Sequence, residues 1–374
     1  MMKSSTIAPD RDLWDPIYSL QEYGRHMLTS VELTVTNACN MRCEHCAVGE
    51  ALTHLEPERL PLEQIFKRLD EVEHLKTLSI TGGEPSFHRD TLLGYVLPIL
   101  KYAKQRGLMT QINTNLTLEY ERYEAIAPYV DVMHISFNYT GAEDFHQIGF
   151  ARSAHPVSFA AAEKMYTRMI ENARKLSKAG TFVSAESMIN YRTHEKIAQI
   201  HHLIADMGCR RHEVHPMYPS DFARDLPLLS LAELRRSIHR LLDDKHPDVW
   251  VLFGTLPFYH CNADEEDQRL LTRLKTMDNV TVRNDPDGRN RLNIDVFTGK
   301  VYVTDFAELS AIGDIRKESL SAVFERWLEH PVFRQVHCHC PEVQCAGPNW
   351  LVKEMYYKHV DFSQRKAQPM GITN

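Results

Sequence analysis

The sequence predicts an α/β protein, namely a partial (β/α)6 TIM-like barrel with a small C-terminal cysteine-rich α+β extension. Between residues 31 and 217, short β-branched or apolar runs alternate six times with longer amphipathic stretches, which is the pattern of βα units. Six units fall short of the eight that close such a barrel, so we expect an open sheet. After Pro227 the pattern changes, and the last three cysteines lie within residues 338–345.

The expected strands are short and rich in β-branched residues, as buried parallel strands are. They cover residues 31–36, 76–82, 109–115, 130–137, 181–189 and 211–217. Helical apolar spacing lies between them, at residues 62–75, 91–107, 160–180 and 194–208. Because parallel strands need crossover helices, this order favours a sheet covered by helices on its outer face.

The chain divides into four predicted segments. They are an N-terminal extension (1–30), the partial barrel (31–226), a C-terminal metal-binding domain (227–361) and a tail (362–374). In the third segment, residues 231–244 have helical spacing, residues 291–304 resemble a hairpin that turns at Thr298 and Gly299, and residues 319–330 have helical spacing. We expect this segment to form the cysteine-rich extension.

Composition limits the cellular setting and the partners. The 374 residues are 43% hydrophobic and 25% charged, with a net charge of −7. No apolar run reaches the roughly 18 residues of a membrane helix, and the N-terminus lacks the apolar core of a secretory signal. We therefore expect a cytoplasmic protein with reduced thiols and no membrane partner. The acidic balance gives no basic stripe, so duplex DNA is not an expected partner.

Three cysteines, Cys39, Cys43 and Cys46, follow the first expected strand with the spacing C-x3-C-x2-C. The first βα loop of such a barrel lies at the face where active sites are built. Three thiolates on one loop can hold three irons of a [4Fe-4S] cluster and leave the fourth iron open. A structural zinc ion would need a fourth ligand, and the adjacent His45 is poorly placed for it. We therefore expect these cysteines to be cluster ligands.

A glycine pair follows the second expected strand, in the segment ITGGEP at residues 80–85. Gly82 and Gly83 would let the backbone come close to a ligand, and Glu84 could hold an ammonium group. The alternative interpretation is an ordinary turn from a strand into a helix.

Together, the cysteine spacing and the GGE segment resemble the radical S-adenosylmethionine (radical SAM) superfamily. His45 stands where many members carry an aromatic residue. The resemblance implies that the open iron binds the amino and carboxylate groups of S-adenosylmethionine and that the GGE segment contacts the amino group. It also implies reductive cleavage to a 5′-deoxyadenosyl radical that abstracts hydrogen from a substrate, with a one-electron donor such as flavodoxin or ferredoxin. The sequence assigns no further catalytic side chain.

Polar residues at the ends of the later strands are the remaining candidates for cofactor binding. In the family such positions contact the ribose, the methionine carboxylate or the adenine, although strand-end capping is an equal alternative. The candidates are Asn113, Asn115, Ser136, Glu186, Asn190 and His215.

A second set of cysteines, Cys338, Cys340 and Cys345, has the spacing C-x-C-x4-C. Cys261, in a polar loop, is the candidate fourth ligand, whereas Cys209 is expected to be a packed thiol. Four cysteines can hold an auxiliary iron-sulfur cluster or a structural zinc ion. We favour the cluster, because an enzyme with one cluster often needs an electron path nearby.

The C-terminal segments 297–306 and 311–327 resemble the SPASM-like extension of radical SAM enzymes that modify peptides. The chain departs from it by carrying Thr304 and Asp305 where a cysteine is usual. It is most similar to the radical SAM/CxCxxxxC-motif proteins of the YfkAB type. A peptide or protein substrate is slightly favoured over a small metabolite, and the other class considered is a non-catalytic electron-transfer protein. Residues 138–160 are long enough to form a lid over the substrate.

Overall fold

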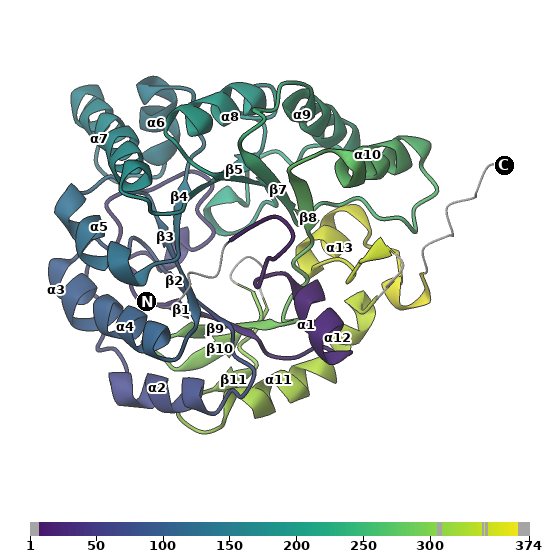
Figure 1. The fold of residues 1–374 in the computed structure, drawn as a ribbon, viewed down its shortest axis with the longest axis horizontal. Helices are drawn as coiled ribbons and strands as arrows, with labels where there is room; N and C mark the ends of the chain where they lie inside the picture. The colour runs from purple at the N-terminus through teal and green to yellow at the C-terminus, as the bar shows by residue number, and fades with distance from the viewer. Residues whose placement is uncertain (1–6, 305–308, 339, 341–342, 366–374) are drawn as a thin grey trace.

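The computed structural model describes residues 7–304, 309–338, 340 and 343–365. Its centre is a sheet with the strand order β11-β10-β9-β1-β2-β3-β4-β5-β6-β7-β8. The strands from β9 through β1 to β8 are parallel, and they curl into a ring with helices outside it (Figure 1). Among the described residues, β8 does not pair with β9, so the ring is not closed. The predicted partial TIM-like barrel is confirmed.

All six strands expected from the sequence are present. They are β1 (Ser30–Thr34), β2 (Thr77–Thr81), β3 (Met109–Thr114), β4 (Val132–Ser136), β5 (Val183–Ile189) and β6 (Arg211–Pro216). The register places Leu33 beside Ile80 and Ile80 beside Ile112, and these three side chains are fully buried. These apolar residues form the core between the sheet and its helices, whereas the residues between them face the inside of the ring.

The parallel sheet is longer than six units. β7 (Trp250–Gly254) and β8 (Val280–Arg283) extend it beyond β6, and β9 (Arg291–Asp295) adds to the other side of β1. Every residue of β7 is buried, as its apolar sequence favours. The sequence analysis did not identify this apolar run, at residues 249–254, as a strand. The βα alternation therefore continues past Pro227, and the domain boundaries stay a prediction.

Helices cover the outside of the ring (Figure 1), and α5, α6 and α10 are present in addition to the helices that the sequence predicts. The longer helices begin at side-chain caps, such as Ser158 for α7 and a capping box of Ser230 with Glu233 for α9. The helices of the barrel are α2 (Leu62–Asp70), α3 (Arg89–Thr91) with a π turn (Leu92–Val96), α4 (Leu97–Gln105), α5 (Tyr120–Ile126), α6 (Ala142–Gly149), α7 (Phe159–Lys178), α8 (Ile197–Asp206), α9 (Leu231–Asp243) and α10 (Glu265–Thr276). Short 3-10 turns lie at Gly49–Ala51, Ala127–Tyr129, Asp221–Ala223 and Phe362–Gln364.

Residues 138–160, expected as a lid, instead contain the packed helix α6. Its Phe145 and Ile148 side chains are buried. The end of α6 holds the cysteine loop, because the Arg42 and Glu44 N–H groups donate to the carbonyls of Gly149 and Ile148, both at 3.0 Å. The segment therefore supports the loop between β1 and α2, and its role as a lid stays a prediction.

The predicted hairpin and helix of the C-terminal extension are present. β9 and β10 (Lys300–Tyr302) pair antiparallel around Gly299, whose φ of 70° requires a residue without a side chain. The edge strand β11 (Gly313–Asp314) and the helices α11 (Leu320–Leu328), α12 (Pro331–Val336) and α13 (Trp350–Tyr356) follow. Trp327 on α11 is buried and donates to the Asp287 carbonyl at 3.0 Å. This contact fixes the extension to the chain segment that leads into β9.

The N-terminal segment covers the end of the ring where the strands begin. Trp14 packs among buried side chains there, including Phe182 and Trp250, and its Nε1 donates to Ser79 Oγ at 3.0 Å. The helix α1 (Pro16–Tyr23) follows it, with Asp15 as its N-cap. The extension at residues 1–30 thus includes a plug at one end of the barrel and leaves the other end for a site.

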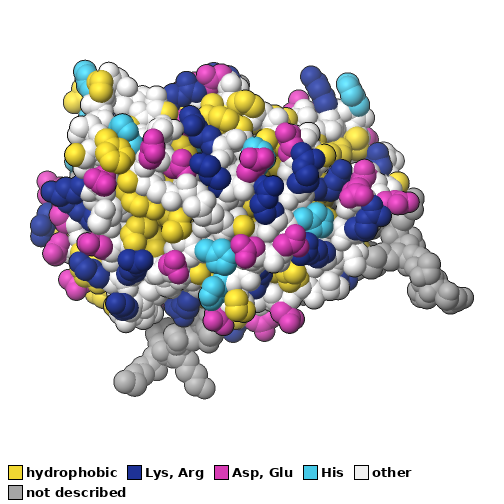
Figure 2. Space-filling model, turned by 90° about the horizontal axis from the view of Figure 1, so that it is seen from above, with side chains coloured by type: hydrophobic (Ala, Val, Ile, Leu, Met, Phe, Trp, Pro, Cys, Tyr) yellow, Lys and Arg dark blue, Asp and Glu magenta, His cyan; other side chains and the backbone are white. Residues whose placement is uncertain are grey.

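The surface carries charges of both signs. On the face seen in Figure 2, Lys and Arg side chains are interspersed with Asp and Glu side chains. None of the helices in the described ranges combines the length and the apolar character needed to cross a bilayer.

Candidate functional site

A cavity of about 220 Å³ lies inside the barrel. Its wall is built from inward side chains of the strands and from the loops that follow β1 and β2. The cysteine loop contributes His45, Ala47 and Val48, and the GGE segment contributes Gly82. The inner faces of the strands contribute Glu32, Gln111, Asn113, His134, Glu186, Glu213, His215 and Arg283. The cavity therefore adjoins the loop that carries the first three cysteines.

The structure places Cys39, Cys43 and Cys46 together on that loop, close enough for their charges to interact. Burial raises the pKa of the Cys39 thiol to about 12 and that of the Cys46 thiol to about 11. All eight cysteines of the chain carry thiols rather than disulfides. Three thiols on one loop suit the iron of a cluster, each binding as a thiolate after its proton leaves. Their role as ligands stays a prediction from the motif.

A buried ion pair fixes the cysteine loop. The Glu44 side chain is 5% exposed, and its carboxylate accepts from Arg192 Nε at 2.7 Å and from the Tyr191 hydroxyl at 3.1 Å. Arg42 donates from Nη1 to the carbonyls of Cys39 and Met41, at 2.9 and 2.8 Å. Because the loop has few apolar side chains of its own, these charged contacts hold its shape.

The glycines of the GGE segment bring two loops together. The Gly83 N–H donates to the Thr36 carbonyl at 2.7 Å, and the Glu84 N–H donates to the Ala38 carbonyl at 2.8 Å. A Cβ atom on Gly82 or Gly83 would lie 2.2 or 2.3 Å from those carbonyl oxygens. The close approach that the sequence indicated is therefore made to the backbone of the cysteine loop, and Gly82 in addition lines the cavity.

Glu84 is buried and engaged by the chain itself. It accepts from Thr114 Oγ1 at 2.8 and 2.9 Å, from the Asn115 N–H at 2.6 Å and from both the N–H and the hydroxyl of Ser86. Burial raises the pKa of Glu84 above its ordinary value, although these hydrogen bonds oppose the rise. Glu84 thus ties the loop after β2 to the end of β3, and its contact with an ammonium group stays a prediction.

The other cofactor-binding candidates divide into three groups. Asn113, Glu186 and His215 line the cavity. Asn115 instead donates from Nδ2 to Asn40 Oδ1 at 2.8 Å and lies in the support of the cysteine loop. Three of these candidates therefore line the cavity, and contact of any of the four, Asn115 included, with the cofactor stays a prediction.

Asn190 and Ser136 lie outside the cavity wall. Asn190 is buried, and its Oδ1 accepts from the N–H groups of Arg192 and Thr193 at 2.9 and 3.1 Å, which is strand-end capping. Ser136 is exposed at the end of β4 and is not among the described residues that line the cavity. Asn190 therefore caps the end of the strand, which is the alternative to cofactor binding. Contact of Asn190 or Ser136 with the cofactor stays a prediction.

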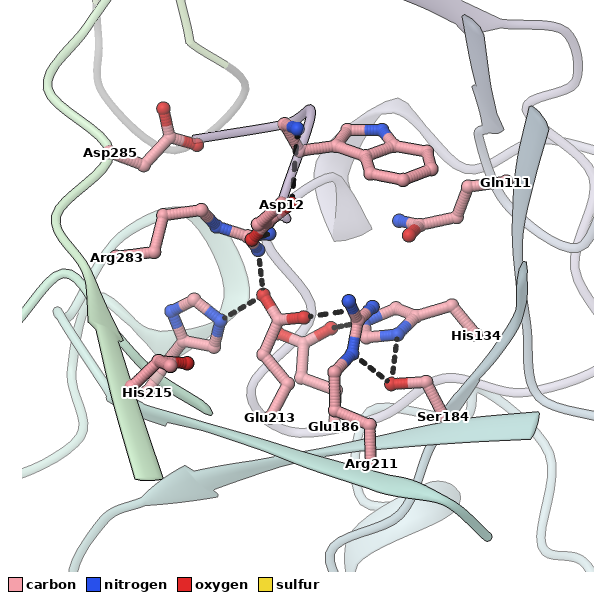
Figure 3. A network of polar contacts seen from close by, with 12 residues as sticks. Asp12, Gln111, His134, Ser184, Glu186, Arg211, Glu213, His215, Arg283 and Asp285 are labelled. Atoms are coloured by element: carbon pink, nitrogen blue, oxygen red, sulfur yellow. Dashed lines mark hydrogen bonds and ion pairs between the residues drawn. The ribbon is translucent and has the colours of Figure 1, made fainter. Parts of the chain in front are cut away.

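A network of buried charges crosses the cavity wall (Figure 3). Glu213 binds the guanidinium of Arg283, lies 3.2 Å from Arg211 Nη2 and lies 3.0 Å from His215 Nε2. Burial alone would raise the pKa of Glu213, but Arg283 and Arg211 hold it well below its usual range. Arg283 also binds Asp12 of the N-terminal plug at 2.9 Å.

The network continues to β4 and β5. His134 Nε2 lies 3.1 Å from a Glu186 oxygen, and His134 Nδ1 lies 3.1 Å from Ser184 Oγ, which also accepts from Arg211 Nε at 2.8 Å (Figure 3). Sequence reasoning missed His134, Glu213 and Arg283. For His134 and Glu213 the signal was available, because polar residues recur at every second position of the strands, in VELT, TQIN, MHIS and RHEVH.

The second set of cysteines is also brought together. Cys261, Cys338, Cys340 and Cys345 surround a small hollow, and Cys340 and Cys345 exchange backbone hydrogen bonds of 2.9 and 3.1 Å. Cys338 Sγ lies 4.0 Å from Cys340 Sγ. Within the described residues, no group of three His, Cys, Asp or Glu side chains meets the geometry of a single-ion site. Cys209 is buried in the core, where a packed thiol was expected.

A buried arginine lies beside the second set of cysteines. Arg289 is fully buried, donates from Nη2 to the Val336 carbonyl at 2.9 Å and lies 4.0 Å from the centre of the Phe333 ring. Burial lowers the pKa of Arg289 to about 9, although the charge of Asp287 and then those of Cys338 and Cys345 act against this. Among the described residues, no carboxylate lies within ion-pair distance of this guanidinium.

The charged network predicts a pH-dependent contribution of His215 to stability. Burial would lower the pKa of His215, but the hydrogen bond to Glu213 and the charge of Glu186 raise it above its ordinary value. Protonated His215 therefore stabilises the folded chain below its unfolded pKa, and this contribution is lost as the pH rises through the folded pKa. We expect His215→Gln to lower the free energy of unfolding by about 1–2 kcal/mol near pH 6 and by less near pH 9.

Urea unfolding of wild type and variant at the two pH values measures this difference. His202→Gln is the matched control, because the pair of His202 with Asp244 is exposed and should contribute little at either pH. An equal loss of stability at both pH values for His215→Gln would show that protonation of His215 plays no part.

Comparison with protein families supports the same architecture. Residues 33–206 match the radical SAM superfamily, and residues 217–367 match the YfkB-like domain. The chain is 52% identical over 367 residues to the protein YfkA of Bacillus subtilis (strain 168), which covers 98% of each chain.

Solved structures share the fold at low sequence identity. SuiB of Streptococcus suis bound to S-adenosylmethionine has a TM-score of 0.60 and 14% identity, over 89% of this chain and 76% of that one. The anSMEcpe structure with bound AdoMet and the Cp18Cys peptide has a TM-score of 0.55 and 13% identity, over 79% of this chain and 80% of that one. The chain therefore belongs to the radical SAM superfamily, as an enzyme of the family of YfkA with a YfkB-like C-terminal domain.

Proposed function

We propose that this enzyme cleaves S-adenosylmethionine beside the cysteine loop and abstracts hydrogen from a peptide or protein at the central cavity. The observation that carries the proposal is the shared wall: His45 and Gly82, from the two motif loops, line the same cavity as the charged strand residues. A [4Fe-4S] cluster, when bound, supplies the electron that breaks the cofactor into methionine and a 5′-deoxyadenosyl radical.

The chain's own residues would hold and isolate this chemistry. Cys39, Cys43 and Cys46 would hold the cluster, and the Glu44–Arg192 pair keeps their loop in one shape. The N-terminal plug closes the opposite end of the barrel, which helps to keep water from a reactive radical. We place the enzyme in the cytoplasm, where reduced thiols persist, with flavodoxin or ferredoxin as the class of electron donor.

Two observations favour a peptide or protein over a small metabolite. SuiB has been solved with the precursor peptide SuiA, and anSMEcpe with the Cp18Cys peptide, and both have the fold of this chain. The hairpin and helix that resemble the extension of peptide-modifying enzymes are both present, as β9–β10 and α11. A small metabolite is the second candidate.

We further propose that Cys261, Cys338, Cys340 and Cys345 hold an auxiliary iron-sulfur cluster, with zinc as the alternative. The buried guanidinium of Arg289 interacts with the charge of Asp287 but forms no ion pair within the described ranges, so additional negative charge nearby would offset the cost of its burial. Four thiolates around either metal centre supply that charge. A cluster adds an electron path that zinc does not provide.

The size of the substrate is testable without knowing its identity. We expect 5′-deoxyadenosine formation by the reconstituted enzyme to rise when the non-dialysable fraction of a cell extract is added. Protease treatment of that fraction should abolish the rise, because the substrate is a polypeptide. If only the dialysable fraction raises 5′-deoxyadenosine formation, the substrate is instead a small metabolite.

The metal of the second site is testable in a chain that lacks the first one. With Cys39, Cys43 and Cys46 all changed to alanine, we expect about four irons and four sulfides per chain after anaerobic reconstitution. Adding Arg289→Met should remove at least half of that iron, because the charge that balances the thiolates is lost. Arg152→Met, at an exposed pair with Asp225, is the control and should leave the iron content unchanged.

Metal analysis and circular dichroism on the same samples decide the outcome. If the chain holds one zinc and no iron, the second set of cysteines forms a structural zinc site and not a cluster. Iron content unchanged by Arg289→Met in a folded chain would reject the charge-balancing role of Arg289.

A further inference from the structure

The strand β8 ends the parallel run, and within the described ranges its outer edge has no neighbouring strand. The Val251 N–H donates to the Asn279 carbonyl and the Thr255 N–H to the Arg283 carbonyl, so the odd-numbered residues face β7. In a parallel pair, alternate residues bond to the same neighbour. The N–H and C=O groups of Val280 and Val282 therefore point to the open edge.

A groove of about 710 Å³ runs along this edge. Residues 280–284 form one wall, and residues of the N-terminal segment between Pro9 and Glu22 form the opposite wall. Residues 343–346, which include Cys345, close one end. The residues of β8 are all half-buried, so solvent reaches the strand from this groove.

The groove and the central cavity share one lining side chain. Arg283 lines both hollows, and its guanidinium reaches inward to Glu213 and Asp12 (Figure 3). A chain segment lying along β8 would therefore contact the Arg283 side chain that also lines the central cavity.

The wall opposite β8 is acidic. It contributes Asp10, Asp12, Asp15 and Glu22 to the groove, against Arg11, whereas Lys275 and Arg283 line the groove from α10 and β8 and Arg283 pairs with Asp12. Burial and the nearby Asp12 raise the pKa of Asp15 to about 7, although the Ile17 N–H and the charge of Arg283 oppose the rise. A positively charged ligand group would relieve the cost of burying this carboxylate.

We propose that the open edge of β8 binds an extended, basic segment of the polypeptide substrate as an added strand. An exposed strand edge offers alternating donors and acceptors that match only another extended backbone, which gives affinity without a fixed side-chain sequence. Basic side chains of the bound segment would face the acidic wall of residues 10–22. The proposal rests on the proposed function, because it takes the substrate to be a polypeptide.

The test removes one outward hydrogen bond and leaves the β7–β8 ladder intact. Val282→Pro deletes the N–H that points to the groove, and proline is tolerated where a strand N–H faces solvent. Val282→Ala is the matched control, because it loses the side-chain packing but keeps the N–H. The probe is a random peptide library, selected on the reconstituted full-length enzyme.

We expect the library to enrich peptides with Lys and Arg. Val282→Pro should weaken the Kd of an enriched peptide about fivefold, as loss of one backbone hydrogen bond does, whereas Val282→Ala should leave it within about twofold of wild type. N-methylation of the peptide should weaken binding at every second residue only, because alternate N–H groups face β8. Equal sensitivity at all positions, or a wild-type Kd for Val282→Pro, overturns the proposal.

Two further outcomes separate this proposal from others. If peptides are enriched only on a chain that lacks residues 1–6, the β8 edge binds the chain's own N-terminus, and the proposal is overturned. A protein fraction that stimulates 5′-deoxyadenosine formation equally in wild type and Val282→Pro would also overturn the β8 site, while leaving the polypeptide substrate in place.

Discussion

The site depends on a backbone contact between the loop after β1 and the loop after β2. Two N–H groups, from Gly83 and Glu84, donate to carbonyls of the cysteine loop at 2.7 and 2.8 Å. The contact leaves no room for a Cβ atom at either glycine, so any other residue would push the loops apart. Glu84 then anchors the pair of loops to β3 through buried hydrogen bonds. The cysteines are thus positioned by the sheet, although they lie on a loop.

The inside of the barrel is lined by charged side chains, which stabilise the fold less than apolar ones would. Buried ion pairs such as Glu213 with Arg211 and Arg283 rarely stabilise a protein as much as apolar side chains of the same volume. Here the pairs connect β6, β8 and the N-terminal plug through Asp12, and they hold polar groups at fixed positions around the cavity. Such fixed charges suit a site where a reactive species must meet one hydrogen of a substrate.

Much of the fold could be predicted from the sequence, because the patterns that indicate strands and the cysteine loop are local. β-branched runs located the first six strands, and the spacing of Cys39, Cys43 and Cys46 indicated a cluster loop. β7 was missed although its run is apolar, because the acidic segment after it obscured the βα pattern. Arg283 and Arg289 were missed because their partners lie far away in sequence and meet them only in the folded chain. The position of Gly82 and Gly83 after β2 could be predicted. The backbone that they approach could not, because the tertiary structure brings the two loops together.

The central claim of the proposed function is that the enzyme draws hydrogen from a polypeptide. The most direct test is the mass of the 5′-deoxyadenosine that the reconstituted enzyme forms with protein from cells grown on deuterated amino acids. If the account is correct, the product gains deuterium from the non-dialysable fraction, because the radical takes hydrogen from a polypeptide C–H bond. Deuterium acquired only from the dialysable fraction would contradict it.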